Sequence, residues 1–573
     1  MDHCIKEFLV QAIKYHGDTH FCISQEKNGE VFHTYSNLMN DICRCMTLYD
    51  ELKDEGNIGL WAETGYEAVV AVFAAFLKGR FIAIIDPSLS WEDASALMKK
   101  ADVSTVIYGK TAVKCEGFGK DETYRKVSSE SYKAYAPFPI EQFPNVSMKA
   151  PALLLFTSGT TGTSKGVVLS FYSLYKQSDL GAGKNPDSVL SILPCYHIYF
   201  FIQLCYVLKT GSIMIFSKGV ASVLEEMQKF QPTFMCVVPI MLVNVFESAK
   251  RIANGDTEKL PEIIKKLTGG RFRIMISGGA GTDRSIFDYY EKAGIIIAEG
   301  YGMTEFGGAL ATNRSDSNVK GSVGELVPFQ QCKIVDGEVY IKSEALFLGY
   351  YKDKEATDEV MKDGWFATGD LGYIEDNHLF LTGRKKNLII LENGENVSPE
   401  ELERLIIASP DVDEVLVKED NNVICAEIYS RLYATIPDAE LVDRINDSVN
   451  EINTELPSYK KIAKTKIRKV PFAKSNIGKI IRGAKEEPGI YIEKGYVAPA
   501  TPLEEAVCKM AREILEIEKV GVDDDFLELG IHSISFVRFN QALEEAGYKI
   551  DISKMFDCTT PRKLAAMIES MKQ

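Results

Sequence analysis

The residues best suited to binding an anion form a short loop after an apolar segment. Residues 152–156 are apolar, have the length of a buried strand, and lead directly into 157–166, which is rich in glycine, serine and threonine. Glycines there let backbone N–H groups turn toward an anion, hydroxyl groups add donors, and Lys165 adds a compact positive charge. This composition predicts a phosphate loop, and composition alone supports an ordinary surface loop equally well.

Other side chains further along the chain could serve a nucleotide. Tyr301 offers a flat face for a purine, Thr304 a hydroxyl for phosphate, and Glu305 a hard oxygen ligand for Mg²⁺. Asp370 follows a glycine, and a carboxylate at such a turn can accept both hydroxyls of a ribose. His197 stands among apolar residues. Taken singly, these are also a core aromatic, solvated charges, a turn aspartate and a buried core histidine.

Alternating strand-like and helix-like runs must position these groups. The segment 58–87 reads as strand, helix, strand, which favours a mostly parallel sheet covered by helices. Residues 273–281 read as a buried strand that ends in a glycine-rich turn. An amphipathic helix is expected near the N-terminus, and the apolar run 68–77 is too short to span a bilayer and is expected to be a core helix. These patterns predict an α/β protein.

Composition narrows the function classes. The chain has 573 residues, enough for several domains, with 46% hydrophobic and 25% charged residues. A net charge of −16 argues against binding nucleic acid or an anionic membrane through bulk charge. The twelve cysteines include no Cys-x-x-Cys pair, so neither a zinc site nor a disulfide framework is indicated. No secretory signal or transmembrane segment is visible, and we expect a cytoplasmic protein.

The order of residues in the loop is more specific than its composition. The run TSGTTGTSKG resembles the phosphate-binding motif of the adenylate-forming superfamily, which holds acyl- and aryl-CoA synthetases, luciferases and the adenylation domains of nonribosomal peptide synthetases. Segments around 278, 301, 370, 384 and 479 resemble further motifs of this superfamily in the same order. The residues that this resemblance assigns to ATP are Thr157, Ser158, Gly159, Thr160, Thr161, Gly162, Lys165, Gly278, Gly279, Ala280, Tyr301, Gly302, Asp370 and Arg384.

The same resemblance implies roles in catalysis. Lys479 would bring a cation to the carboxylate and the α-phosphate, Lys386 would be the hinge between a large and a small domain, and Mg²⁺ would bind Glu305 and Thr161. Thr304, Glu305 and His197 complete the implied catalytic set. The run of basic residues near Lys479 lacks the interleaved aromatic residues of a nucleic-acid site.

The segment 193–212 bears on the acid that is activated. Its Leu-Pro-x-x-His pattern resembles that of aryl- and fatty-acid CoA ligases, in which the histidine borders and gates the acyl pocket. The run His197-Ile198-Tyr199 resembles hydroxycinnamate ligases, whereas the turn 392–396 resembles fatty-acyl ligases. No acidic residue occurs in 193–212, and a buried ammonium without a partner is costly. We therefore expect a fatty or aryl acid in preference to an amino acid.

The C-terminal part changes in composition. A proline-containing stretch reads as a linker, followed by an amphipathic helix over 503–517 and a last helix over 561–571. Between them, Ser533 lies at a step from loop to helix. Alone it would be a helix N-cap, but its flanking residues resemble those of peptidyl and acyl carrier domains, in which this serine carries 4′-phosphopantetheine.

Together these features predict a fold and an activity. The expected α/β fold has a large adenylation core of layered sheets and helices (1–385), a small α+β subdomain (386–487), a linker (488–502) and an all-α four-helix carrier (503–573). The enzyme would use ATP and Mg²⁺ to form acyl-AMP and load the phosphopantetheine on Ser533, in natural-product biosynthesis of the nonribosomal peptide or polyketide type. Expected partners are a phosphopantetheinyl transferase and a downstream condensation, ketosynthase or tailoring enzyme. The alternatives are a ligase acting on free CoA, an amino-acid-loading module and a non-catalytic scaffold.

Overall fold

The fold is that of a computed structural model. It describes residues 4–26, 29–52, 56–157, 164–178, 186–278, 284–313, 319, 321–391, 395–420, 423–474, 480–483, 497–515, 519–524, 526, 529, 533–548, 550, 558 and 560–571, of which 284, 458, 515 and 533–537 are described by their main chain alone. The chain divides into two compact units. The first comprises Met1–Thr368 with Gly372–Leu381, and the second Gly369–Leu371 with Thr382–Gln573.

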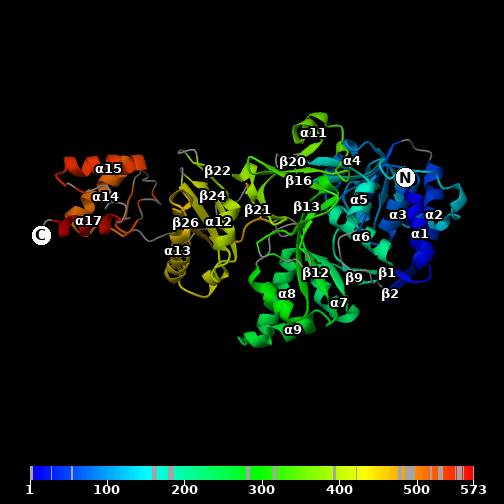
Figure 1. Cartoon of the computed structure of the whole chain (residues 1–573), viewed down its shortest axis with the longest axis horizontal. Helices are drawn as coiled ribbons and strands as arrows, with labels where there is room; N and C mark the ends of the chain where they lie inside the picture. Colours follow the sequence, from blue (N-terminus) through cyan, green and yellow to red (C-terminus); the bar gives the residue numbers. More distant parts are fainter. Residues whose placement is uncertain are drawn as a thin grey trace. The chain divides into compact units, whose positions relative to one another are not determined.

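Two large sheets form the framework of the first unit (Figure 1). The strands of the larger sheet, in order across it, are β16 (Gln331–Val335), β17 (Glu338–Lys342), β20 (Trp365–Glu375), β21 (His378–Arg384), β15 (Glu325–Leu326), β14 (Gly308–Thr312), β13 (Ile296–Met303), β12 (Ile274–Ser277), β11 (Phe234–Val237), β9 (Ser188–Ser191), β10 (Ile213–Phe216), β1 (His20–Glu26) and β2 (Gly29–Thr34), with β19 (Met361–Lys362) paired to β20. The run from β13 to β1 is parallel.

The second sheet is smaller and carries the predicted phosphate loop. Its strands, in order, are β18 (Gly349–Tyr350), β8 (Lys165–Ser170), β7 (Pro151–Thr157), β4 (Ile82–Ile84), β3 (Asn57–Trp61), β5 (Val103–Tyr108) and β6 (Arg125–Ser128). Strands β3 and β4 are parallel and are joined by helix α3, so the predicted strand, helix, strand unit is confirmed.

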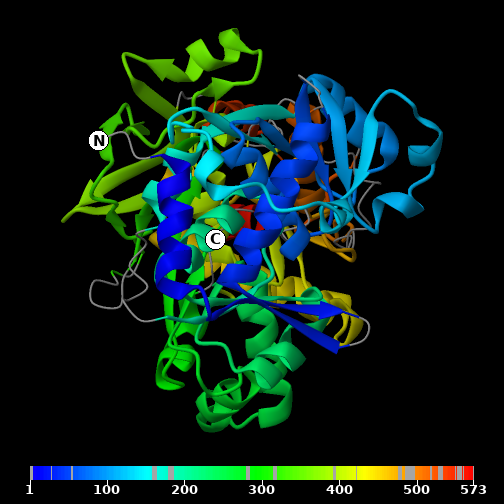
Figure 2. The ribbon, with the colours of Figure 1, turned by 90° about the vertical axis from the view of Figure 1, so that its right-hand side faces the viewer.

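Helices cover both faces of the sheets. They are α1 (Ile5–His16), α2 (Tyr35–Leu52), α3 (Tyr66–Leu77), α4 (Trp91–Lys100), α5 (Phe171–Gln177), α6 (Ile198–Thr210), α7 (Val223–Phe230), α8 (Pro239–Ala253), α9 (Leu260–Leu267), α10 (Phe287–Lys292) and α11 (Lys354–Val360). Figure 2 shows the long blue helices α2 and α3 beside one another, and their side chains share one core with those of α5 and α6. Neighbouring residues of a strand face opposite cores: Met235 packs with α7–α10, and Cys236 packs with α6.

The second unit contains two separate cores. The first surrounds a sheet of β24 (Glu414–Asp420), β25 (Val423–Tyr429) and β26 (Lys464–Arg468), packed with α12 (Pro399–Ile406) and α13 (Asp438–Glu455), next to a hairpin of β22 (Ile389–Ile390) and β23 (Asn396–Val397). The second core lies among α14 (Pro502–Leu515), α15 (Ser533–Glu545) and α17 (Pro561–Ser570). The expected small α+β part and helical C-terminal part are both present. Among the described helices, none is long and apolar enough to cross a membrane.

Candidate active site

The two ends of the predicted phosphate loop lie side by side. Strand β7 ends at Thr157, β8 begins at Lys165, and these two residues are register partners in an antiparallel pair. The strand predicted over 152–156 is therefore confirmed, and the chain after the loop returns as a strand of the same sheet. The other loop residues assigned to ATP, Ser158, Gly159, Thr160, Thr161 and Gly162, lie outside the described residues.

Tyr350 contacts both Lys165 and Glu305. The Lys165 ammonium is 4.8 Å from the centre of the Tyr350 ring, a cation–π contact, and the Tyr350 hydroxyl donates to Glu305 Oε1 over 3.0 Å. Burial raises the pKa of Tyr350 well above its usual value, so the phenol stays protonated and remains a donor. Tyr350 belongs to strand β18, which pairs with β8. It was missed from the sequence because no chemical pattern marks it, and only the strand pairing places it here.

Thr304 and Glu305 form a short turn of 3₁₀ helix after β13. The Glu305 carboxylate is buried, and its backbone carbonyl accepts from Phe347 N at 2.7 Å. Tyr301 is also buried, with its ring edge-on to Phe306 at 5.9 Å between centroids. Gly302 has a steric role, because a Cβ there would lie 2.0 Å from the carbonyl oxygen of Gly308 on β14. Strand β13 and the turn after it thus place these predicted motif residues together at the carboxyl end of one strand.

His197 and Gly278 meet the first turn of helix α6. His197 precedes α6 at its N-cap, and burial lowers its pKa, which favours the neutral imidazole. The Tyr199 hydroxyl donates to the carbonyl oxygen of Ile276 at 2.9 Å, and a Cβ on Gly278 would lie 3.3 Å from the Tyr199 ring. The helix start therefore lies against the end of β12. Gly279 and Ala280 lie outside the described residues.

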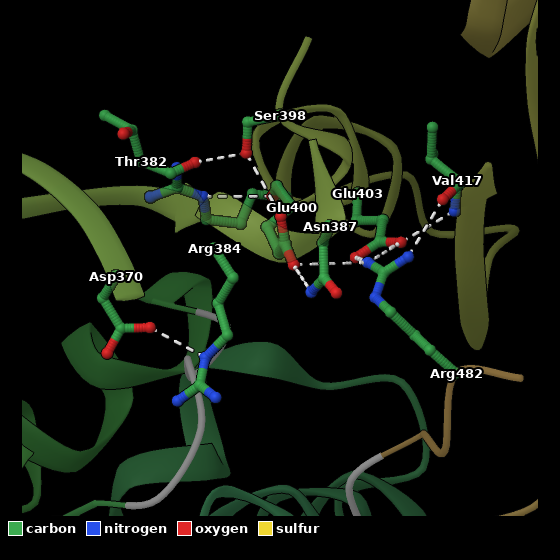
Figure 3. Close-up of polar contacts among 10 residues, drawn as sticks. Asp370, Thr382, Arg384, Asn387, Ser398, Glu400, Glu403, Val417 and Arg482 are labelled. Atoms are coloured by element: carbon green, nitrogen blue, oxygen red, sulfur yellow. Dashed lines mark hydrogen bonds and ion pairs between the residues drawn. The ribbon is translucent and has the colours of Figure 1, made fainter. Parts of the chain in front are cut away.

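The structure brings Asp370 and Arg384 together in the second unit. Arg384 Nε lies 2.7 Å from Asp370 Oδ1, and the aspartate side chain is 6% exposed (Figure 3). Lys386, the predicted hinge, lies in a 3₁₀ turn of residues Lys385–Asn387, and the Asn387 amide donates to Glu400 at 2.5 Å. A carboxylate and a guanidinium so placed can accept from and donate to a ribose.

The predicted catalytic Lys479 and the predicted phosphopantetheine attachment site Ser533 both belong to the second unit. Lys479 lies outside the described residues, as do Gly478 and the rest of 475–479, but the flanking Lys474 and Ile480 form an antiparallel bridge. Ser533 is the first residue of α15, as predicted from the step from loop to helix, and its main chain alone is described. A serine at a helix start suits a prosthetic group with a phosphodiester, because helix N-termini favour anions.

The Glu305 carboxylate is an oxygen ligand of the kind that Mg²⁺ prefers. Among the described residues, no three His, Cys, Asp or Glu side chains cluster as a metal site. Mg²⁺ is usually held by one or two carboxylates together with substrate phosphates, and buried Glu305 could supply one carboxylate.

Three family models match the chain. That of the AMP-binding enzymes matches residues 9–351, that of the AMP-binding enzyme C-terminal domain 386–488, and that of the phosphopantetheine attachment site 505–568.

Curated relatives and solved structures agree with these matches. Long-chain-fatty-acid–CoA ligase FadD15 of Mycobacterium bovis is 29% identical over 47% of this chain. The match spans only 52% of the length of FadD15. The 2-succinylbenzoate–CoA ligase of Bacillus licheniformis is 28% identical over 64% of this chain and 77% of the length of that ligase. A structure of McyG A-PCP complexed with phenylalanyl-adenylate has a TM-score of 0.75 at 21% identity, covering 99% of this chain and 98% of that one. The last likeness is one of fold.

Proposed function

Because this chain belongs to the AMP-binding enzyme family, we propose that it activates a carboxylic acid with ATP and loads the acyl group onto its own carrier domain. A carboxylate oxygen attacks the α-phosphorus of ATP, the bond to the bridging oxygen breaks, and acyl-AMP and pyrophosphate form. The thiol of 4′-phosphopantetheine on Ser533 then takes the acyl group, and AMP leaves.

The observation that carries this proposal is the contact of both Lys165 and Glu305 with Tyr350. The first step brings two anions together, so it needs positive charge at the phosphates. Lys165 and the donor-rich loop that ends there supply part of it, and Lys479 supplies the rest at the α-phosphate. Bound Mg²⁺ would neutralise phosphate charge beside Glu305, with Thr161 as the second ligand. Asp370 and Arg384 would hold the ribose.

We propose that the two half-reactions use different orientations of the small domain. The thiol needs the place at the acyl-AMP that Lys479 occupies in the first step, so residues 386–487 would turn about Lys386. In this reading 1–385 form the core, 488–502 the linker and 503–573 the carrier.

We propose a fatty or aryl acid as substrate. Helix α6, which follows His197, has a buried, apolar run from Phe200 to Leu208, interrupted by Gln203. Buried Asp187, which is near the end of this helix, accepts from Tyr206 at 2.6 Å and Thr233 at 2.5 Å and pairs with Arg273, so its lone pairs are committed. These contacts favour an uncharged acyl group over an α-ammonium.

We also propose the biological setting. A chain that loads a carrier needs a phosphopantetheinyl transferase to supply the prosthetic group and a condensation, ketosynthase or tailoring enzyme to take the product, as in cytoplasmic nonribosomal peptide or polyketide biosynthesis.

An ATP–pyrophosphate exchange screen tests the proposal. Fatty, aryl and amino acids would be offered singly to the full-length protein, and we expect exchange with an acyl or aryl acid. Exchange with an amino acid alone would reassign the substrate. Acylation of free CoA much faster than of the holo-carrier would favour the CoA-ligase alternative.

A further inference from the structure

Arg482 stands three residues after Lys479 and is held by two glutamates. We propose that Arg482 is a positioning residue: gripped by Glu403 and Glu400, it ties the segment that carries Lys479 to the hinge turn, so that the lysine turns with the hinge as one body. This inference rests on the proposed function, because it concerns how Lys479 is delivered to the first half-reaction.

The main chain on both sides of the lysine segment is fixed. Lys474 and Ile480 form an antiparallel bridge, and Ile481 N donates to the carbonyl oxygen of Ala473 at 2.9 Å. The two residues that flank 475–479 are therefore paired with each other. In the proposal, a displacement of either flank would displace Lys479.

The first flank is anchored by Glu414. Its side chain is buried, and its two carboxylate oxygens take different partners: Oε1 lies 2.5 Å from Lys474 Nζ, and Oε2 accepts from Phe472 N at 2.7 Å. One carboxylate on β24 thus fixes both a main-chain and a side-chain group ahead of the segment.

The second flank is anchored by Arg482. One guanidinium nitrogen lies 2.5 Å from both carboxylate oxygens of Glu403, and the other donates to the carbonyl oxygen of Val417 at 3.0 Å (Figure 3). Glu403 also accepts from Val417 N at 2.7 Å. Arg482, Glu403 of α12 and Val417 of β24 therefore close one set of contacts, and the planar fork of arginine is needed to reach both acceptors.

Glu400 extends this set of contacts to the hinge turn. Its Oε1 lies 3.7 Å from Arg482 and accepts from the Asn387 amide at 2.5 Å. Asn387 is the residue after Lys386. Next to it, the Ser398 hydroxyl donates to the carbonyl oxygen of Thr382 at 2.6 Å, which fixes the strand that enters the turn. Polar contacts thus run from Arg482 through Glu400 to Asn387, the residue after the predicted hinge.

The ion pairs of Arg482 with Glu403 and Glu400 form a clamp whose strength depends on ionisation. Two carboxylates face one guanidinium, and burial raises the pKa of Glu403 to about 7 against the opposing effect of Arg482. Repulsion from the Glu400 carboxylate contributes to this increase in the Glu403 pKa. The clamp is therefore fully ionic on the alkaline side of neutrality.

Comparison of the two half-reactions tests the proposal. In the full-length holo-protein, Arg482→Ala should lower kcat for pyrophosphate exchange by about 100-fold, the scale of a small misplacement of a catalytic group, and Arg482→Lys should recover part of it. KM for ATP should be unchanged, and so should transfer from supplied acyl-adenylate. Partial unfolding would lower both half-reactions by one factor, so a change in their ratio excludes it.

A matched control keeps the test specific. Arg444 and Asp411 form a similar two-contact ion pair between α13 and the turn after α12, at 3.0 and 2.5 Å. Arg444→Lys should leave the ratio of half-reactions at the wild-type value. Equal losses in both half-reactions for Arg482→Ala, or an unchanged ratio, would overturn the positioning role.

Amide hydrogen exchange separates this inference from the proposed function. Arg482→Ala should speed exchange in peptides covering 470–482 and 382–390 by about tenfold, and Arg444→Lys should not. If the wild type performs no pyrophosphate exchange but this pattern of amide exchange appears, the proposed activity is wrong and Arg482 does connect the two segments. If wild type and Lys479→Ala behave as proposed but neither peptide changes, the proposed connection through Arg482 is wrong.

Discussion

Lys165 and Glu305 both contact the side chain of Tyr350, the lysine over the ring and the glutamate at the hydroxyl. The ammonium is 4.8 Å from the ring centre, and the carboxylate accepts from the phenol hydroxyl at 3.0 Å. A cation at the end of the predicted phosphate loop and a predicted Mg²⁺ ligand thus contact one residue.

Tyr350→Phe should impair the site with a modest loss of stability. It removes a hydrogen bond to a charged group, which costs about 1.5–3 kcal/mol of unfolding free energy, and it lets the Glu305 carboxylate turn. We expect pyrophosphate-exchange kcat/KM to fall about tenfold. Denaturant unfolding and exchange kinetics measure the two effects.

Tyr290→Phe is the control for this change. The hydroxyl of buried Tyr290 donates to the carbonyl oxygen of Leu242 at 2.6 Å, among helices α8 and α10. The control should lose stability by about 1 kcal/mol and keep its exchange rate. Equal kinetics for both variants would argue against a role of Tyr350 in the site.

Much of the fold follows from sequence pattern. The strand over 152–156 and the unit from β3 to β4 both follow from runs of apolar residues whose length and period match the element. The apolar runs could not give the order of strands in the larger sheet, because sequential strands such as β9 and β10 pair while β10 also meets β1 from the chain's start.

The site was less predictable than the fold. Motif order marked Asp370, Arg384 and Glu305, but a motif does not state which residue contacts which. Tyr350, Glu400 and Glu403 carried no signal, because an isolated tyrosine or a glutamate in a helix is read as core or solvated surface. Their roles arise from pairing between strands and helices distant in sequence, and these contacts are set by tertiary packing.

Lys479→Ala should abolish acyl-AMP formation and spare the second half-reaction. The lysine's charge is proposed to act at the first transition state, where one preorganised contact is worth about 2.7–4 kcal/mol. Pyrophosphate exchange measures the first step, and thioester formation from supplied acyl-adenylate measures the second. Equal loss in both would contradict the assigned role.

Asp370→Asn should weaken ATP binding more than it slows the chemistry. The change removes one negative charge beside Arg384 and replaces an acceptor of ribose hydroxyls by an amide that is half donor. We expect KM for ATP to rise about tenfold with kcat within about threefold, since the ribose contact is similar in the ground and transition states. Asp411→Asn, which breaks the comparable pair with Arg444, should leave KM unchanged. A fall in kcat alone would place Asp370 in the chemical step.

The pH dependence of Glu403 should have opposite signs for stability and activity. Burial raises its pKa from 4.5 to about 7, so between these values the folded protein binds more protons than the unfolded chain. The Glu403 contribution to stability should therefore be full below about pH 4.5 and be lost as pH rises to about 7, whereas exchange activity should rise over the upper part of this range as the clamp becomes ionic. Glu403→Gln should flatten the pH dependence of both stability and activity.

The two pH dependences are measured by following the unfolding free energy and the rate of pyrophosphate exchange as pH is varied, with Asp411→Asn as the control. An unaltered slope in Glu403→Gln would assign the titration to another group.

Ser533→Ala should abolish loading of the carrier without affecting acyl-AMP formation. A phosphopantetheinyl transferase with CoA should add the prosthetic group to the wild type, which should then gain the acyl mass when given ATP and acid. A linker of about 14 residues has a root-mean-square reach of about 20 Å and would hold the thiol near its site at about millimolar effective concentration, so transfer within one chain is expected to be independent of protein concentration. Intact-protein mass spectrometry of wild type and Ser533→Ala, at two protein concentrations, measures both mass changes.

Thr560→Ala is the control for a disturbed helical core, because it removes the N-cap contact of helix α17 to Lys563 N at 3.3 Å. It should still be loaded. Thioester-linked acyl mass on Ser533→Ala would show that another group accepts the acyl chain and would reject the carrier assignment.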